Sequence, residues 1–189
     1  VEPIDNLFVK FSTGMDMSYS TRGNYFPKET LYGTAKGGEG RLWNRFSQHT
    51  SNELTATYNL DINTIHRITL LGGYIFEKTI ENSSNLLNHE FITDGFLWNN
   101  LGAGTGTKEL GSDASENMMA SYLGRINYTL MDRYLLTATV RRDGSSVFAA
   151  NNKWGIFPSF AIGWNIAEES FMDFSNEFLD MAKFRVSWG

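Results

Sequence analysis

Few residues in this chain have the types and spacings that chemistry requires. The three histidines, His49, His66 and His89, are far apart in the sequence, and none has a second ligand at the spacing of a zinc site. The chain has no cysteine, which excludes thiol catalysis, disulfides and thiolate metal sites. We therefore expect no metal and no cofactor, and we interpret the histidines as solvated or hydrogen-bonded.

Two short motifs have the residue types of functional loops but lack the required context. The glycine-rich run 102–106 could cradle a phosphate, but Lys108 comes late and no amphipathic helix follows. A flexible loop tip is the better interpretation. Ser145 and Ser146 have no histidine placed by the local sequence to activate a hydroxyl as a nucleophile. Nothing in the sequence assembles an enzyme.

The clearest structural pattern lies at 121–143, which reads as two strands joined by a tight turn at 131–133. Side chains alternate between two faces with the period of two that is typical of a β-strand. One face is apolar, with Tyr122, Ile126, Tyr128, Tyr134, Leu136, Ala138 and Val140, and the other is polar, with Arg125, Asn127, Thr129, Thr137, Thr139 and Arg141. A sheet with an apolar face and a polar face is typical of an outer-membrane β-barrel.

The composition agrees with this interpretation. The chain is 41% hydrophobic with a mean hydropathy of −0.30, since polar residues facing a lumen dilute those facing lipid. Aromatic residues make up 14%, and only 3 prolines interrupt the strands. No apolar run is long enough for a transmembrane helix, which needs about 18 residues or more. The net charge of −5 and the lack of a basic run argue against nucleic acid as a partner.

Seven strand-like segments can be marked along the chain. They are 6–19, 41–60, 65–79, the pair within 121–143, 155–168 and a segment that begins at Lys183, with a short helical turn expected within 168–182. Tight turns are predicted at 61–64 and 131–133, and longer loops at 20–40, 80–117 and 144–154. Barrels have short periplasmic turns and long extracellular loops, so this order predicts which end of the sheet faces outward.

Two further features bear on this assignment. The second segment exceeds the length that crosses a bilayer, which indicates strands that project above the membrane or an irregularity near 48–52. The loop 80–117 is rich in acid, with Asp94, Glu109, Asp113 and Glu116, which could bind a cation or a partner but are typical of a solvated loop. We expect it to be the region that contacts ligand or partner, because long loops on a rigid scaffold often carry function.

The sequence also predicts on which face the side chains of the sixth segment lie, and where the aromatic residues lie along the strands. Phe160, Ile162, Trp164 and Ile166 should point one way, and Ser159, Ala161, Gly163 and Asn165 the other. Tyr58, Tyr128, Tyr134 and Trp164 lie near the predicted periplasmic ends, where an aromatic girdle is expected. The alternative is a soluble β-sandwich, whose core-facing aromatics also alternate.

The run 132–172, followed by 183–189, closely resembles the barrel of SusC/RagA-type TonB-linked outer-membrane proteins of Bacteroidetes. The matching residues, which we expect to be structural, are Asp132, Arg133, Tyr134, Asp143, Gly144, Ser145, Ser146, Trp154, Gly155, Phe157, Pro158, Gly163 and Trp164. The match continues through Phe171-Met172 and through Lys183, Arg185, Ser187 and Gly189. Ala149 and Trp188 depart from the family pattern, which often has glycine and tyrosine there.

This resemblance implies an all-β fold, an antiparallel transmembrane β-barrel segment that supplies about seven of roughly 22 strands. All of 1–189 would belong to the C-terminal barrel domain, without the plug domain or the segment that engages TonB. The chain therefore looks like an internal piece of a longer protein. Arg125, Asn127, Arg141 and Asp143 would face the lumen and are the candidate substrate-binding residues.

The resemblance also implies a function and partners. The protein would be a TonB-dependent importer in the outer membrane, taking up oligosaccharides or peptides with a SusD-like surface lipoprotein and energy from TonB-ExbB-ExbD. It would contact outer-membrane lipid and would not be an enzyme. The alternatives are a stand-alone TonB-dependent receptor for a ferric siderophore or cobalamin, and a soluble β-rich glycan-binding module.

Overall fold

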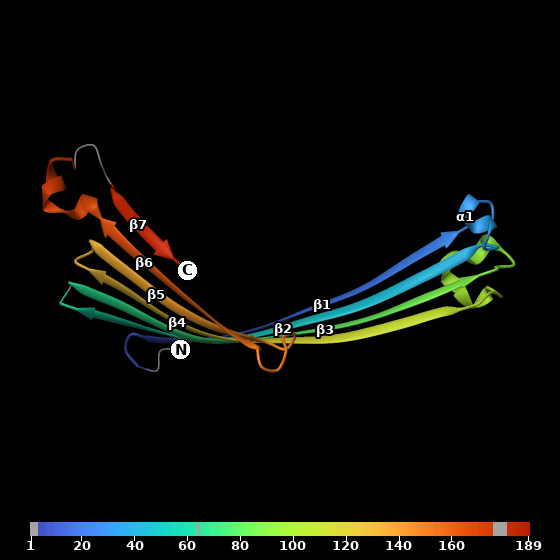
Figure 1. Ribbon diagram of the computed structural model, residues 1–189, viewed down its shortest axis with the longest axis horizontal. Helices are drawn as coiled ribbons and strands as arrows, with labels where there is room; N and C mark the ends of the chain where they lie inside the picture. The colour runs from blue at the N-terminus through green and yellow to red at the C-terminus, as the bar shows by residue number, and fades with distance from the viewer. Residues whose placement is uncertain (1–3, 64, 176–180) are drawn as a thin grey trace. The chain divides into compact units, whose positions relative to one another are not determined.

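The computed structural model describes residues 4–63, 65–175 and 181–189, in which seven strands form one sheet in chain order, β1-β2-β3-β4-β5-β6-β7 (Figure 1). The order of neighbours follows from antiparallel hairpins, which need only short connections. The strands are β1 (Leu7–Phe26), β2 (Glu39–Ile62), β3 (His66–His89), β4 (Glu109–Leu130), β5 (Tyr134–Ser145), β6 (Trp154–Asn165) and β7 (Lys183–Trp188).

Short helical segments occupy three of the connections. α1 (Leu31–Thr34) lies between β1 and β2, and the 3-10 segment η1 (Asp94–Ala103) lies between β3 and β4. Two further 3-10 segments, η2 (Ile166–Glu168) and η3 (Ser170–Ser175), follow β6. Among the described residues, no helix has the length and apolar character needed to cross a membrane.

The chain divides into two compact units. The first unit comprises Val1–Gly14, Ser51–Glu77 and Met118–Gly189, and the second comprises Met15–Thr50 and Lys78–Asn117. β5, β6 and β7 belong entirely to the first unit. Both long connections, the one containing α1 and the one containing η1, belong to the second.

The predicted strand count and the positions of the tight turns are confirmed, but several predicted loops are wrong. The chain pairs as strand through half of the predicted loop 80–117, which shrinks to 90–108, and the predicted loop 20–40 shrinks to 27–38. β2 is a single strand through 48–52, where an irregularity was considered. Serine, asparagine and glycine dominate the missed strand ends. They give no apolar alternation, but their backbones still form the ladder.

Smaller differences lie at the ends of the sheet. Ile166 was assigned to the apolar face of the sixth strand, but β6 ends at Asn165 and Ile166 begins η2. The helical turn predicted within 168–182 is confirmed by η3, and the seventh strand begins at Lys183 as predicted. Of the predicted turn 61–64, Thr64 lies outside the described residues.

The alternation predicted for β4, β5 and β6 is confirmed by their register. Ile126 pairs with Ala138, and Ala138 pairs with Phe160, so these three side chains share one face. Arg125 pairs with Thr139, and Thr139 pairs with Ser159 on the opposite face. The turn between β4 and β5 is tight because Met131 and Asp132 both adopt positive φ, at 53° and 57°.

Candidate functional site

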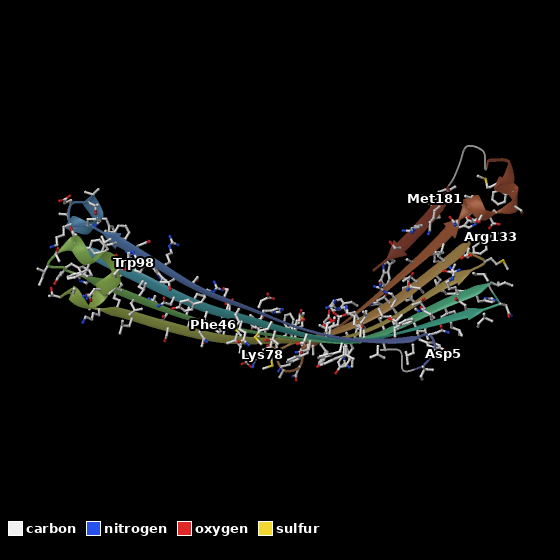
Figure 2. All side chains as sticks on the ribbon, turned by 180° about the vertical axis from the view of Figure 1, so that it is seen from behind. Asp5, Phe46, Lys78, Trp98, Arg133 and Met181 are labelled. Carbon is white, nitrogen blue, oxygen red and sulfur yellow. The ribbon has the colours of Figure 1, made fainter. Side chains whose placement is uncertain are left out.

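One face of the first unit is apolar and open. Two neighbouring rows of paired residues cross β4 to β7 on this face. The first row is Tyr128, Leu136, Ile162 and Val186, and the second is Ile126, Ala138, Phe160 and Trp188. These side chains are not covered by any second layer: Ile162 is 63% exposed and Val186 is 57% exposed. Side chains leave the ribbon on both of its sides (Figure 2). A contiguous exposed apolar surface of this kind indicates contact with lipid or with a partner.

Aromatic rings bound this apolar face at both ends. At the end nearest the 131–133 turn, Tyr134 pairs with Trp164, which pairs with Phe184. At the other end the ring centroids of Tyr74 and Tyr122 are 5.1 Å apart, and those of Tyr122 and Trp154 are 5.8 Å apart.

The spacing between the two aromatic ends fits a bilayer. About eight residues of β5 separate Tyr134 from Arg142, the β5 residue that pairs with Tyr122. At ~3.4 Å per residue and a strand tilt of ~40°, this length covers about 20 Å of membrane depth. Outer-membrane barrels show an apolar band about 25 Å tall between two aromatic girdles. The first unit therefore has the dimensions of a transmembrane barrel wall.

The opposite face of the same strands carries the four predicted lumen-facing residues. Arg125 Nε donates to Thr139 Oγ1 at 3.1 Å, and Asn127 Oδ1 accepts from Thr137 Oγ1 at 2.9 Å. Arg125 remains exposed. These bonds join neighbouring strands and leave the guanidinium of Arg125 open to solvent or ligand.

Arg141 and Asp143 form a tighter arrangement on this polar face. Arg141 Nε donates to Asp143 Oδ1 at 2.7 Å, and its Nη2 donates to the Oγ of Ser121 at 3.3 Å. Ser121 is 1% exposed. Because the guanidinium and carboxylate satisfy each other beside a buried hydroxyl, this pair is held more firmly than Arg125.

A cluster of polar side chains closes the end of the first unit beyond β6. Glu169 accepts hydrogen bonds from Tyr134 Oη at 2.6 Å and from Trp164 Nε1 at 3.0 Å, and it pairs with Arg133 at 3.2 Å. The hydrogen bond from Tyr134, followed by that from Trp164 and the charge of Arg133, lowers the pKa of Glu169. This cluster ties the segment after β6 to the start of β5.

Many of the family-motif residues lie near hairpin ends in the first unit, while Phe157 and Pro158 lie within β6. Asp132, in the turn between β4 and β5, forms a 3.1 Å ion pair with Arg67 of β3. Ser146 Oγ accepts from the backbone N–H of Met118 at 2.8 Å, and Ser145 Oγ accepts from that of Val147 at 3.4 Å. The hydroxyls of the Asp-Gly-Ser-Ser run therefore bond to backbone amides. Trp154 and Trp164 contribute to the two aromatic ends.

The second unit holds a loop cluster that sequence analysis missed. Tyr25 Oη donates to Asp94 Oδ1 at 2.6 Å, and Lys28 Nζ donates to the carbonyl of Ile92 at 2.8 Å. Between these contacts Phe91 is buried at 3% exposure and packs edge-on against Tyr25, with ring centroids 5.3 Å apart. The two long connections, 27–38 and 90–108, are thus fixed to each other.

Buried polar side chains reinforce this loop cluster. Glu39, 1% exposed, pairs with Arg41, whose guanidinium also donates to Tyr32 and lies 5.3 Å from the Phe26 ring centroid. Asn88, also 1% exposed, donates to the carbonyls of Leu101 and Gly104. Asp94, one of the acidic residues of the predicted loop 80–117, has a structural partner in Tyr25.

The described residues hold no cluster of metal-binding side chains. His49 contacts Thr79 and His66 contacts Tyr128, at 3.1 and 2.7 Å. Nδ1 of His89 is buried without a partner. Over 4–63, 65–175 and 181–189, no three His, Cys, Asp or Glu side chains are arranged to hold a metal ion. The run 102–106 begins within the last residues of the kinked 3-10 segment η1 and does not follow a strand.

Comparison with known proteins places this geometry in context. The chain is 36% identical over 188 residues to TonB-dependent receptor P3 of Formosa agariphila, covering 100% of this chain and 19% of the relative. It is 37% identical over 136 residues to TonB-dependent receptor SusC of Bacteroides thetaiotaomicron, covering 70% of this chain and 14% of the relative. The chain thus spans about a fifth or less of the length of these relatives. No protein-family model matches it.

Solved structures share the same fold. The structure of the RagAB peptide transporter superposes with a TM-score of 0.87 at 24% identity, covering 98% of this chain and 20% of that one. The RagAB peptide importer in its open-open state gives a TM-score of 0.80 at 22% identity, again covering 98% of this chain and 20% of that one. Sequence and fold together therefore identify the chain as part of a SusC/RagA-like TonB-dependent receptor.

Proposed function

We propose that this chain forms part of the barrel wall of a TonB-dependent importer in the outer membrane of a Gram-negative, Bacteroidetes-like cell. The observation that carries the proposal is the two-sided first unit. Its exposed apolar face is bounded at both ends by aromatic rings, and its opposite face carries Arg125, Asn127, Arg141 and Asp143. An apolar exterior with a polar interior is the arrangement of a barrel that encloses an aqueous or plugged lumen.

We propose oligosaccharides or peptides as the class of cargo. Relatives named for SusC and for RagAB peptide transport support this class. Import would proceed by binding and by movement of a plug, as the relationship to receptors and transporters supports. The chain would therefore act as a transporter segment and not as an enzyme.

The partners follow from the same proposal. A SusD-like lipoprotein would cover the extracellular side, and the TonB-ExbB-ExbD complex would supply energy through a plug domain and a TonB-engaging segment elsewhere in the protein. All of residues 1–189 would belong to the barrel domain. The loop cluster around Tyr25 and Asp94 would lie on the extracellular side, where long connections are expected.

The lumen-facing residues would have two different roles. Arg125 is exposed and has one neutral hydrogen-bond partner, which leaves it free to contact cargo. Arg141 and Asp143 neutralise each other at 2.7 Å and would shape the wall. Asn127 would offer an amide hydrogen-bond donor beside them.

Co-purification of the full-length protein from its native host tests the proposal. The outer membrane is extracted in mild detergent, and proteins that remain bound in stoichiometric amounts are identified by mass spectrometry. We expect a surface lipoprotein to co-purify, and we expect deletion of the protein to abolish growth on one oligosaccharide or peptide source. A membrane-embedded protein without a lipoprotein would indicate a stand-alone receptor, and recovery in the soluble fraction would refute the barrel assignment.

A further inference from the structure

A single charged side chain lies on the apolar face of the first unit where β4 to β7 are in register. Across the described pairs of these strands, that face carries Arg142 among aromatic, aliphatic and glycine residues. Arg142 pairs with Tyr122 on one side and with Ile156 on the other. A guanidinium that points toward lipid costs free energy unless it reaches the interface and finds an anion there.

The contacts of Arg142 leave its charge uncompensated by protein. Its guanidinium lies 4.6 Å from the ring centroid of Trp154, a cation–π contact, and no carboxylate within the described residues pairs with it. Arg141, its neighbour in sequence, points to the opposite face and pairs with Asp143. The two adjacent arginines thus differ in partner: one has a protein carboxylate, and the other has an indole face and an exposed edge of N–H donors.

The indole that supports Arg142 is itself held in place. A Cβ on Gly144 would lie 2.7 Å from Cε3 of Trp154, so the ring packs flat against the Gly144 backbone, where only glycine fits. Tyr122 adds a second ring 5.8 Å from Trp154. Gly144, Trp154 and Arg142 therefore stack in that order, and the guanidinium is oriented before any ligand arrives.

The position of this stack along the strands matches a lipid headgroup. Arg142 is about eight residues from Tyr134, at the aromatic end farthest from the 131–133 turn. Since tight turns face the periplasm, this end meets the outer leaflet. Next to it, on the side toward the 131–133 turn, lies an apolar hollow of about 530 Å³, lined in part by Ile126, Val140 and Phe160. A headgroup bound at Arg142 could place an acyl chain against this hollow.

We propose that Arg142, presented by Trp154 and Gly144, binds the phosphate of a phosphorylated lipid headgroup in the outer leaflet. Guanidinium binds phosphate through two charge-assisted hydrogen bonds, and the indole face leaves those donors free. The adjoining apolar hollow favours a lipid over free phosphate, because the acyl chain adds buried apolar area. This inference rests on the proposed location in the outer membrane.

The test compares lipid retention by the full-length protein and single variants, after membrane extraction has shown that each is inserted. Monophosphorylated lipid A is titrated into detergent-purified protein, and bound lipid is counted by native mass spectrometry. Dephosphorylated lipid A and inorganic phosphate serve as comparison ligands. The variants are R142Q and G144A, with R185Q as the matched control, because Arg185 lies on the opposite face of β7.

We expect R142Q to weaken binding of the phosphorylated lipid about tenfold to a hundredfold, a loss typical of hydrogen bonds made by a charged group. G144A should weaken binding as well by displacing Trp154, and R185Q should bind like the wild type. Neither dephosphorylated lipid A nor inorganic phosphate should compete effectively.

Equal binding by inserted R142Q and wild type would overturn the lipid site while leaving the membrane proposal intact. Equal competition by inorganic phosphate would overturn the lipid assignment in favour of an anion site. Failure of the wild type to insert would refute the proposed function itself.

Discussion

Tyr25, near the end of β1, donates a 2.6 Å hydrogen bond to Asp94, which lies in the connection after β3 and 69 positions away in the sequence. This contact, with Phe91 packed beside it, fixes the end of β1 to the connection after β3, and Lys28 in the connection after β1 donates to the carbonyl of Ile92 in the same segment. Tyr25 and Asp94 both lie in the second unit, outside the apolar band of the first. The loops that the family is proposed to present to the outside are therefore bound to each other.

Removing this hydrogen bond should loosen both connections. We expect Tyr25→Phe to cost about 1 kcal/mol, since the acceptor is a carboxylate but the site is only partly buried. Limited proteolysis of the full-length protein in detergent should then cut the segment 90–108 about fivefold faster. Tyr19→Phe is the control, because Tyr19 is 70% exposed and donates a longer, 3.3 Å bond to Asn44. Equal protection in both variants would contradict this role of Tyr25.

The same contact predicts a response to alkaline pH. Burial, followed by the hydrogen bond to Asp94 and its charge, raises the pKa of Tyr25 to about 12. Because the folded pKa lies above the ordinary value of 10.0, the folded state keeps the proton longer, and the stabilisation falls as pH rises from about 10 to 12. Cleavage of 90–108 should accelerate in this window for the wild type and not for Tyr25→Phe. A pH-independent wild type would refute the prediction.

A glycine on β1 admits the indole of Trp98 from η1, a residue labelled in Figure 2. A Cβ on Gly23 would lie 2.0 Å from Cδ2 of Trp98, so Gly23→Ala must displace the ring. We expect thermal unfolding to show a loss of about 1 to 3 kcal/mol, as for other overpacked sites. Gly14→Ala, on the same strand but with nothing within 4 Å, should cost little.

A double-mutant cycle isolates this contact between Gly23 and Trp98. In a protein that already carries Trp98→Ala, the further change Gly23→Ala should cost almost nothing, because the ring that the new methyl group would displace is gone. If Gly23→Ala cost the same free energy of unfolding with and without the indole, the close approach of the two residues would not be the cause.

Glu169 should make stability depend on acid. Its pKa is lowered by the hydrogen bonds from Tyr134 and Trp164. A lowered folded pKa gives stabilisation that is present above the ordinary value, about 4.3, and is lost as pH falls through the folded value. Thermal unfolding should show Glu169→Gln with a lower Tm than the wild type at pH 7, and the two Tm values should converge in acid. A constant difference down to the most acidic pH at which the protein stays folded would contradict the role given to this carboxylate.

On the polar face, the exposed Arg125 and the ion pair of Arg141 with Asp143 should separate transport from stability. Arg125→Gln should alter cargo affinity with less than about 0.5 kcal/mol change in stability, as expected of an exposed side chain. Asp143→Asn should destabilise by about 1 kcal/mol, since it leaves Arg141 beside the buried Ser121 without its carboxylate. Uptake assays and thermal unfolding on the same membranes would show this split. If Arg125→Gln proved to be less stable than Asp143→Asn, the assignment of Arg125 to cargo contact and of the Arg141–Asp143 pair to the barrel wall would be contradicted.

Sequence predicted the fold best where one face is apolar. β5 and β6 alternate along most of their length, with Leu135, Arg142 and Phe157 as exceptions, so the faces of their side chains and the 131–133 turn follow from periodicity. The parts of β1, β3 and β4 next to the connections 27–38 and 90–108 are predicted as loops, because a stretch such as 80–85 is largely polar on both faces and gives no alternation. Backbone pairing holds these strand ends, and no side-chain pattern reports it.

The polar sites were harder to predict than the strands. Arg125, Asn127, Arg141 and Asp143 could be placed on one face, since facing depends only on the period of two. Their pairing could not, because Arg141 reaches Ser121 only through the β4–β5 register. The contact between Tyr25 and Asp94 depends on the connection 90–108 folding against the end of β1, which no local signal in the sequence indicates.

The most direct test of the two-sided barrel wall is a spin-label scan of β6 in the full-length protein in its membrane. Single cysteines are introduced from Phe157 to Trp164 and labelled with a nitroxide, and collisions with oxygen and with water-soluble nickel chelate are compared at each site. We predict a period of two, with oxygen favoured at Phe160 and Ile162 and with low oxygen access at Ser159 and Ala161. Access of the nickel chelate to both faces without alternation would contradict the account.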